Sequence, residues 1–169
     1  REDMYLNTAR YELIREVKKN INIPLIANGD IDSPEKAKYV LDYTGADAVM
    51  IGRAAQGRPW IFREIAHYLE TGEHLAAPEI VEVKQVLMGH LAELYQFYGE
   101  YSGCRIARKH IAWYTKGLRS SNEFRQNMYK VENTADQAKV VESYFDQLLD
   151  QGRRMSDVQV EQVNLLEIK

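Results

Sequence analysis

Two short apolar segments separated by a capped helix constrain the fold of this chain more than any other feature. Residues 24–27 and 46–51 are apolar runs of strand length, and each is followed by a turn that contains glycine. Between them, Ser33-Pro34 supplies a helix N-cap and a proline at the first helical position, so a helix is predicted from Pro34 to Tyr43, ending near Gly45. Strand, helix and strand in this order predict a βαβ unit with two buried, parallel strands.

The rest of the chain has helical periodicity. An amphipathic helix is predicted over residues 9–20, with Leu13, Ile14 and Val17 on its apolar face. Another helix is expected to begin at Pro59 and to end at Thr71-Gly72. Beyond it the pattern stays helical and predicts four helices, over residues 79–98, 103–117, 121–132 and 135–150.

These patterns predict an α/β part followed by an all-α part. We expect the α/β part to occupy residues 1–72, a linker residues 73–78, and a four-helix domain residues 79–151. Residues 152–169 are polar and lack a clear helix cap, so a frayed tail or a weakly packed helix is expected there.

Composition excludes several classes of protein. Apolar residues make up 45% and charged residues 28% of the 169 residues, a balance typical of folded globular domains. No apolar run approaches the roughly 20 residues that cross a bilayer, so a cytoplasmic protein without membrane contact is expected. The single cysteine, Cys104, cannot form an internal disulfide, and neither a second thiol nor a close histidine pair suggests a metal site.

Charge is distributed unevenly along the chain. The net charge of −3 conceals a block, residues 101–130, that carries seven basic side chains and one acidic side chain. At helical spacing Arg105, Arg108, Lys109 and Lys116 share one face of the helix predicted over residues 103–117. Such a face can bind the phosphates of a nucleic acid, although a solvated helix face with incidental charge would have the same composition.

Polar and glycine residues follow both predicted strands. Asn28-Gly29-Asp30 ends the first strand and Gly52-Arg53 ends the second, and the carboxyl ends of parallel strands are where α/β proteins bind ligands. A glycine lets backbone N–H groups approach a phosphate closely, and arginine adds a planar cation with several donors. Either loop alone could simply end a strand, but the pair predicts a phosphate site.

Longer segments resemble one enzyme family. Residues 23–31 (IPLIANGDI) and 42–62 (DYTGADAVMIGRAAQGRPWIF) are similar to the flavin-phosphate half of bacterial tRNA-dihydrouridine synthases. Tyr98-Gly99 and residues 105–114 (RIARKHIAWY) resemble the helical domain of the B-type enzymes. The resemblance covers roughly residues 10–150 and implies the last two strands of a (β/α)₈ TIM barrel followed by a four-helix bundle.

The resemblance also implies an activity. The family reduces uridine in tRNA to 5,6-dihydrouridine with FMN, which NADPH reduces in turn. By resemblance, the cofactor-binding residues are Asn28, Gly29, Asp30, Gly52 and Arg53, and the tRNA-binding residues are Arg105, Arg108, Lys109 and Lys116. For Asp30, a role in shaping the turn is weighed equally with a flavin contact.

Part of the expected machinery lies outside this sequence. The family's proton-donating cysteine belongs to an earlier barrel loop, so no catalytic residue is expected here, and Cys104 cannot replace it. The chain alone is therefore expected neither to hold FMN tightly nor to reduce uridine. The two strands would leave unpaired edges, which predicts self-association or disorder of the first residues. Two alternatives stay open: a non-catalytic RNA-binding module, and another FMN-dependent barrel oxidoreductase.

Overall fold

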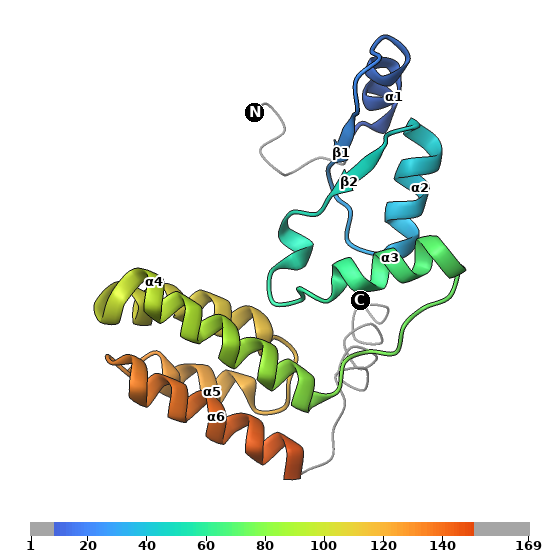
Figure 1. Ribbon diagram of the computed structural model, residues 1–169. Helices are drawn as coiled ribbons and strands as arrows, with labels where there is room; N and C mark the ends of the chain where they lie inside the picture. The colour runs from blue at the N-terminus through green and yellow to red at the C-terminus, as the bar shows by residue number, and fades with distance from the viewer. Residues whose placement is uncertain (1–8, 151–169) are drawn as a thin grey trace, which may run out of the picture. The chain divides into compact units, whose positions relative to one another are not determined.

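The computed structural model describes residues 9–150, which divide into two compact units with a boundary between Leu75 and Ala76 (Figure 1). The first unit contains α1 (Tyr11–Lys19), β1 (Ile26–Asn28), α2 (Pro34–Thr44), β2 (Ala48–Met50), the short 3₁₀ helix η1 (Arg53–Ala55) and α3 (Ile61–Thr71). The second contains α4 (Ile80–Tyr114), α5 (Ser121–Met128) and α6 (Thr134–Asp150). The expectations for the first residues and for the tail from residue 152 lie outside the described residues.

The predicted βαβ unit is confirmed. β1 and β2 pair in parallel, with Ala27 opposite Val49, and α2 connects them. The Ser33 hydroxyl accepts a hydrogen bond from the Lys36 N–H at 3.1 Å and so caps α2. Gly45 ends the helix in the left-handed conformation, with φ of 71°.

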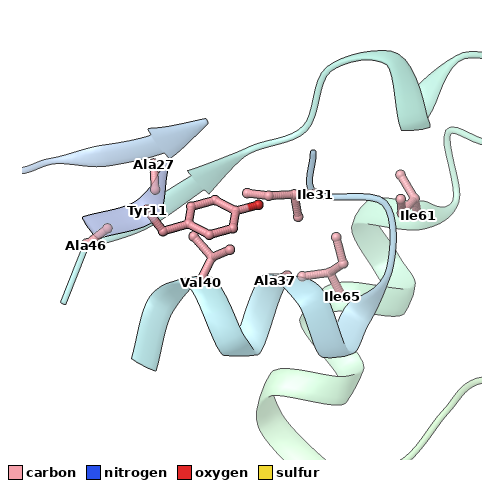
Figure 2. Close-up of a cluster of buried hydrophobic side chains, with 8 residues drawn as sticks. All are labelled: Tyr11, Ala27, Ile31, Ala37, Val40, Ala46, Ile61 and Ile65. Carbon is pink, nitrogen blue, oxygen red and sulfur yellow. The ribbon is translucent and has the colours of Figure 1, made fainter. Parts of the chain in front are cut away.

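One cluster of apolar side chains joins the elements of the first unit. Tyr11 lies between the strand pair and α2, and the other labelled members of the cluster come from β1, α2, α3 and the loops beside the strands (Figure 2). The buried members are Tyr11, Ala27, Ile31, Ala37, Val40, Ala46, Ile61 and Ile65. Burial of this surface is the main term that holds α1, the strands and α3 around α2.

The prediction of two fully buried strands is wrong. Ala27 faces the cluster, but Ile26 is 62% exposed and Met50 is 56% exposed. Because side chains alternate across a strand, the face that packs on α2 is buried and the opposite face is open among the described residues. The apolar face predicted for the first helix is confirmed only at Ile14, which packs against the cluster beside the buried Tyr11, whereas Leu13 and Val17 are about half exposed.

A single glycine divides α4 into two helical segments. Gly99 has φ of 72° and ψ of 178°, which no helix contains, so the predicted break between residues 98 and 103 is confirmed. The second segment folds back along the first (Figure 1). Gly103 permits the close approach, because a Cβ there would lie 3.2 Å from the Tyr95 Cα. The two segments therefore form a helical hairpin.

A buried glutamine connects this hairpin to α6. Gln137 accepts a hydrogen bond from the Tyr95 hydroxyl at 2.8 Å and donates one to the Cys104 carbonyl at 3.1 Å. Its side chain is fully buried, so these partners replace the water that it loses on folding. The apolar core around it includes Leu87, Leu91, Ile111, Val141 and Phe145. No helix within residues 9–150 is long and apolar enough to cross a membrane.

Candidate phosphate-binding loops and nucleic-acid interface

The strand register brings the two predicted loops to one edge of the sheet. Asn28 lies opposite Met50, so Gly29-Asp30 and Gly52-Arg53 both leave the carboxyl ends of neighbouring parallel strands. The Arg53 guanidinium donates to the Asp30 carboxylate at 3.3 Å. The structure thus joins four of the five predicted cofactor-binding residues in two touching loops, with Asn28 immediately before them.

Asp30 holds its loop together. Its backbone is left-handed, with φ of 47°, and its second carboxylate oxygen accepts the Ala9 N–H at 2.8 Å. The carboxylate therefore ties the first loop to the residue before α1 and to Arg53. These contacts favour the turn-shaping role that the sequence left open for Asp30.

Glycine occurs at positions 29 and 52 for different structural reasons. Gly29 has φ of 131°, and a Cβ there would lie 2.6 Å from the Ala9 Cβ. Gly52 is exposed, and a Cβ built on it meets nothing within 4 Å among the described residues. Packing therefore requires a glycine at 29, whereas at 52 a side chain would only fill the space in front of the loop.

This difference gives a stability prediction. Gly29→Ala is expected to lower the free energy of unfolding of the first unit by roughly 1–3 kcal/mol, because the backbone is strained for any other residue and Ala9 must move. Gly52→Ala is the comparison: it meets no neighbouring atom among the described residues, but its backbone, with φ of −98° and ψ of −112°, is also unfavourable for other residues, so a smaller loss of about 1 kcal/mol is expected. Urea unfolding followed by circular dichroism measures both. Equal stability of the two variants would contradict the described packing.

Sequence reasoning missed the third component of this site, which is Ala9 and the first residue of α1, Tyr11. The Tyr11 hydroxyl donates to the Gly29 carbonyl at 2.6 Å, and burial, followed by the nearby charge of Asp30, raises the pKa of Tyr11. Ala9 and Tyr11 thus fix the loop after β1 from the other side. An apolar residue and a tyrosine in a helical pattern give no signal for this contact.

Arg58 braces the second loop. Its guanidinium donates to Glu64 at 2.6 Å and to the Asp32 carbonyl at 3.3 Å, and the side chain is half-buried. Trp60 is buried, 6% exposed. These contacts and this burial give both residues a structural role beside the loop.

The basic block of the second unit lies mostly on its surface. Arg105, Lys109 and Lys116 are exposed, as are Arg119 and Lys130. Within residues 9–150, none of the block's seven cations forms an ion pair with a carboxylate, whereas Lys84 in the same unit contacts Asp146 at 2.6 Å. The cations of α4 therefore keep their charge available to an outside anion.

Arg108 differs from its predicted partners. Its side chain is half-buried, and its guanidinium donates to the Val131 carbonyl at 2.9 Å. The Nε atom is buried without a hydrogen-bond partner. The Val131 carbonyl, between α5 and α6, thus accepts one N–H of this guanidinium, which gives Arg108 a structural contact that Lys109 lacks.

Cys104 is fully enclosed. It is 1% exposed, its Sγ lies 3.6 Å from the Val131 carbonyl, and burial raises the pKa of the thiol. A protonated, enclosed thiol is a poor nucleophile and a poor proton donor to an outside substrate.

His110 packs inside the hairpin. Its ring lies 4.7 Å from that of His90 and 5.0 Å from that of Trp113, and burial lowers the pKa of both histidines. The ring contacts give His110 a structural role within the hairpin. Trp113 is half-buried and Tyr114 is buried, so both contribute to packing in the hairpin.

The chain combines an α/β unit, with two touching loops at the carboxyl ends of its parallel strands, and a helical unit with a cationic surface. Such a strand edge is where α/β proteins bind ligands. The sequence profile of the dihydrouridine synthase (Dus) family matches residues 1–149, so the chain belongs to that family.

Curated relatives carry the same family name. The chain is 56% identical over 149 residues to tRNA-dihydrouridine synthase B of Shewanella oneidensis, an alignment that covers 88% of this chain and 46% of that protein. It is 54% identical over 149 residues to the enzyme of the same name from Proteus vulgaris, with the same coverage. For Pseudomonas aeruginosa the identity is 53% over 152 residues, covering 90% of this chain and 46% of the relative. The chain thus spans about half the length of these relatives and matches their C-terminal portion.

Proposed function

We propose that this chain is the C-terminal part of an FMN-dependent tRNA-dihydrouridine synthase. In this proposal β1 and β2 are the last two strands of a (β/α)₈ barrel, and the second unit is a four-helix tRNA-binding domain. The open face of the strand pair supports the first assignment, because Ile26 and Met50 are apolar side chains that a complete barrel would cover. The family match and the relatives' names support the activity.

The paired loops fit a flavin phosphate. Gly52 leaves open the space that a Cβ would fill, and the Arg53 guanidinium reaches the same edge from the neighbouring position. Asn28, Gly29, Gly52 and Arg53 would hold the phosphate and the ribityl chain, while Asp30 would position Arg53. When bound, FMN supplies the hydride for reduction of the uracil ring, and NADPH is the proposed reductant of the flavin.

The Asp30 carboxylate does not prevent anion binding. Its pair with Arg53 is solvent-exposed, and such pairs stabilise a protein by only about 0–1 kcal/mol. A phosphate can therefore accept hydrogen bonds from part of the guanidinium while the Asp30 carboxylate keeps its hydrogen bond from the Ala9 N–H.

The helical unit would bind tRNA through Arg105, Lys109 and Lys116, with Arg108 as a supporting residue. Each cation that contacts a phosphate releases counterions and adds to the salt dependence of binding. One observation carries the proposal: this member of the family has both the paired loops and a cationic helix. The cations of that helix have no carboxylate partner among residues 9–150. A non-catalytic RNA-binding module would not need the first feature, and an FMN enzyme for small molecules would not need the second.

A chimera tests the activity. The N-terminal part of the Shewanella oneidensis relative is joined to this chain in place of the relative's matched portion. The chimera is expected to retain flavin absorbance through purification and to form dihydrouridine in a tRNA transcript with NADPH, measured by mass spectrometry of nucleosides. The 169-residue chain alone is expected to do neither. A folded chimera without turnover would refute the proposed activity, and turnover by the chain alone would refute its dependence on the relative's N-terminal part.

A further inference from the structure

Three aromatic side chains are exposed around the turn of α4. Phe97 is 80% exposed, Tyr101 68% and Tyr98 46%, and the rings of Phe97 and Tyr98 meet edge to face at 4.8 Å. Single exposed aromatic residues are common, but adjacent ones on a small unit indicate a contact surface. None of the three belongs to the core that joins the helices, so packing does not account for them.

The turn that carries these rings is fixed. The Glu100 carboxylate accepts hydrogen bonds from the Thr134 N–H at 2.8 Å and from the Thr134 hydroxyl at 2.9 Å. These bonds attach the residue after Gly99 to the start of α6, and the turn lies at the end of the hairpin (Figure 1). The aromatic side chains are therefore presented on a rigid support, which lowers the entropy that a partner must offset on binding.

Two cations lie between two aromatic residues along the second segment of α4. Tyr101, Arg105, Lys109 and Trp113 are each four residues apart and so form one stripe on the helix. The Arg105 guanidinium lies 4.5 Å from the centre of the Tyr101 ring, and the Lys109 amine lies 5.8 Å from that of Trp113. The exposed Tyr101 ring and the Arg105 guanidinium offer flat surfaces to nucleobases, and Arg105 and Lys109 offer positive charge to phosphates.

We propose that Phe97, Tyr101 and Arg105 form a platform on which unpaired bases of tRNA stack. The proposal rests on the proposed function and adds to it a surface that reads single-stranded RNA rather than phosphate charge alone. A protein partner would also accept exposed rings, but the neighbouring cations have no carboxylate partner among residues 9–150 and suit a polyanion. Folded RNA presents splayed bases in its loops, and aromatic rings and guanidinium planes stack on them regardless of base identity.

The test uses the 169-residue chain and two RNA ligands, a tRNA transcript and a blunt RNA duplex without unpaired bases. Phe97→Ala and Tyr101→Leu are each expected to raise the tRNA dissociation constant about tenfold and to leave duplex binding and the salt slope unchanged. Tyr101→Phe keeps the ring and should bind tRNA like the wild type. Phe62→Ala, which removes an exposed ring in the first unit, is the matched control and should have no effect.

The outcomes separate this proposal from the proposed function. If the wild-type chain binds tRNA but Phe97→Ala and Tyr101→Leu bind it equally well, the stacking platform is refuted and the tRNA-binding assignment stands. Equal losses for tRNA and duplex would also refute stacking, because a duplex offers no free base. A wild-type chain that fails to bind tRNA would refute the proposed function itself. Circular dichroism melting confirms that each variant is folded.

Discussion

Arg53→Gln in the chimera is expected to weaken FMN binding by roughly 10- to 100-fold. A hydrogen bond from a charged donor to a phosphate contributes about 1.5–3 kcal/mol, and glutamine removes both the charge and the planar fork. The side chain is 62% exposed and its pair with Asp30 is weak, so its loss should change the free energy of unfolding little. Flavin fluorescence titration gives the dissociation constant, and urea unfolding gives the stability.

Lys38→Gln is the matched control for Arg53. Lys38 lies on α2, is about half exposed, and pairs with Asp42 at 2.9 Å, so its replacement changes the net charge equally without touching the loops. It should leave FMN affinity within about twofold of wild type. If Arg53→Gln and Lys38→Gln behaved alike, the loop after β2 would not be the phosphate site.

A triple variant of the second unit is expected to weaken tRNA binding on the order of 100-fold at low salt. It replaces three exposed cations with glutamine, as Arg105→Gln, Lys109→Gln and Lys116→Gln. Each lost contact with a phosphate weakens binding and lowers the slope of the salt dependence by about one. Electrophoretic or fluorescence-anisotropy titration of a labelled tRNA transcript measures the change. The matched control is a triple glutamine variant at Lys19, Lys38 and Lys139, which are exposed lysines with acidic neighbours.

Arg108 provides an internal contrast to that prediction. Because its guanidinium bonds the Val131 carbonyl, Arg108→Gln should lower the free energy of unfolding of the helical unit by about 1–3 kcal/mol. Lys109→Gln, one residue further, should leave it nearly unchanged. A loss of tRNA affinity in Arg108→Gln without any loss of stability would show that Arg108 contacts RNA directly.

Local signals were the most informative part of the sequence. Ser33, Pro34 and Gly45 determine where α2 begins and ends through contacts within a few residues, so the pattern alone located the helix. The break at Gly99 was predictable for the same reason, since glycine there interrupts two helical periods.

Properties that depend on distant neighbours could not be predicted. The burial of Ile26 and Met50 depends on which element covers the second face of the sheet, and a run of apolar residues does not contain that information. Arg108 and Lys109 are adjacent in sequence, yet only the position of the Val131 carbonyl distinguishes their roles. The contribution of Ala9 and Tyr11 to the loop after β1 likewise arises from a contact about 20 residues away in the chain.

The central claim, that one chain combines a phosphate-binding strand edge with a tRNA-binding helical unit, is tested most directly by tRNA affinity across a salt series. With three to four phosphate contacts, the association constant of the wild-type chain should fall several tens of fold between about 50 and 200 mM salt. A flat dependence over that range, or no binding at the lowest salt, would contradict the claim.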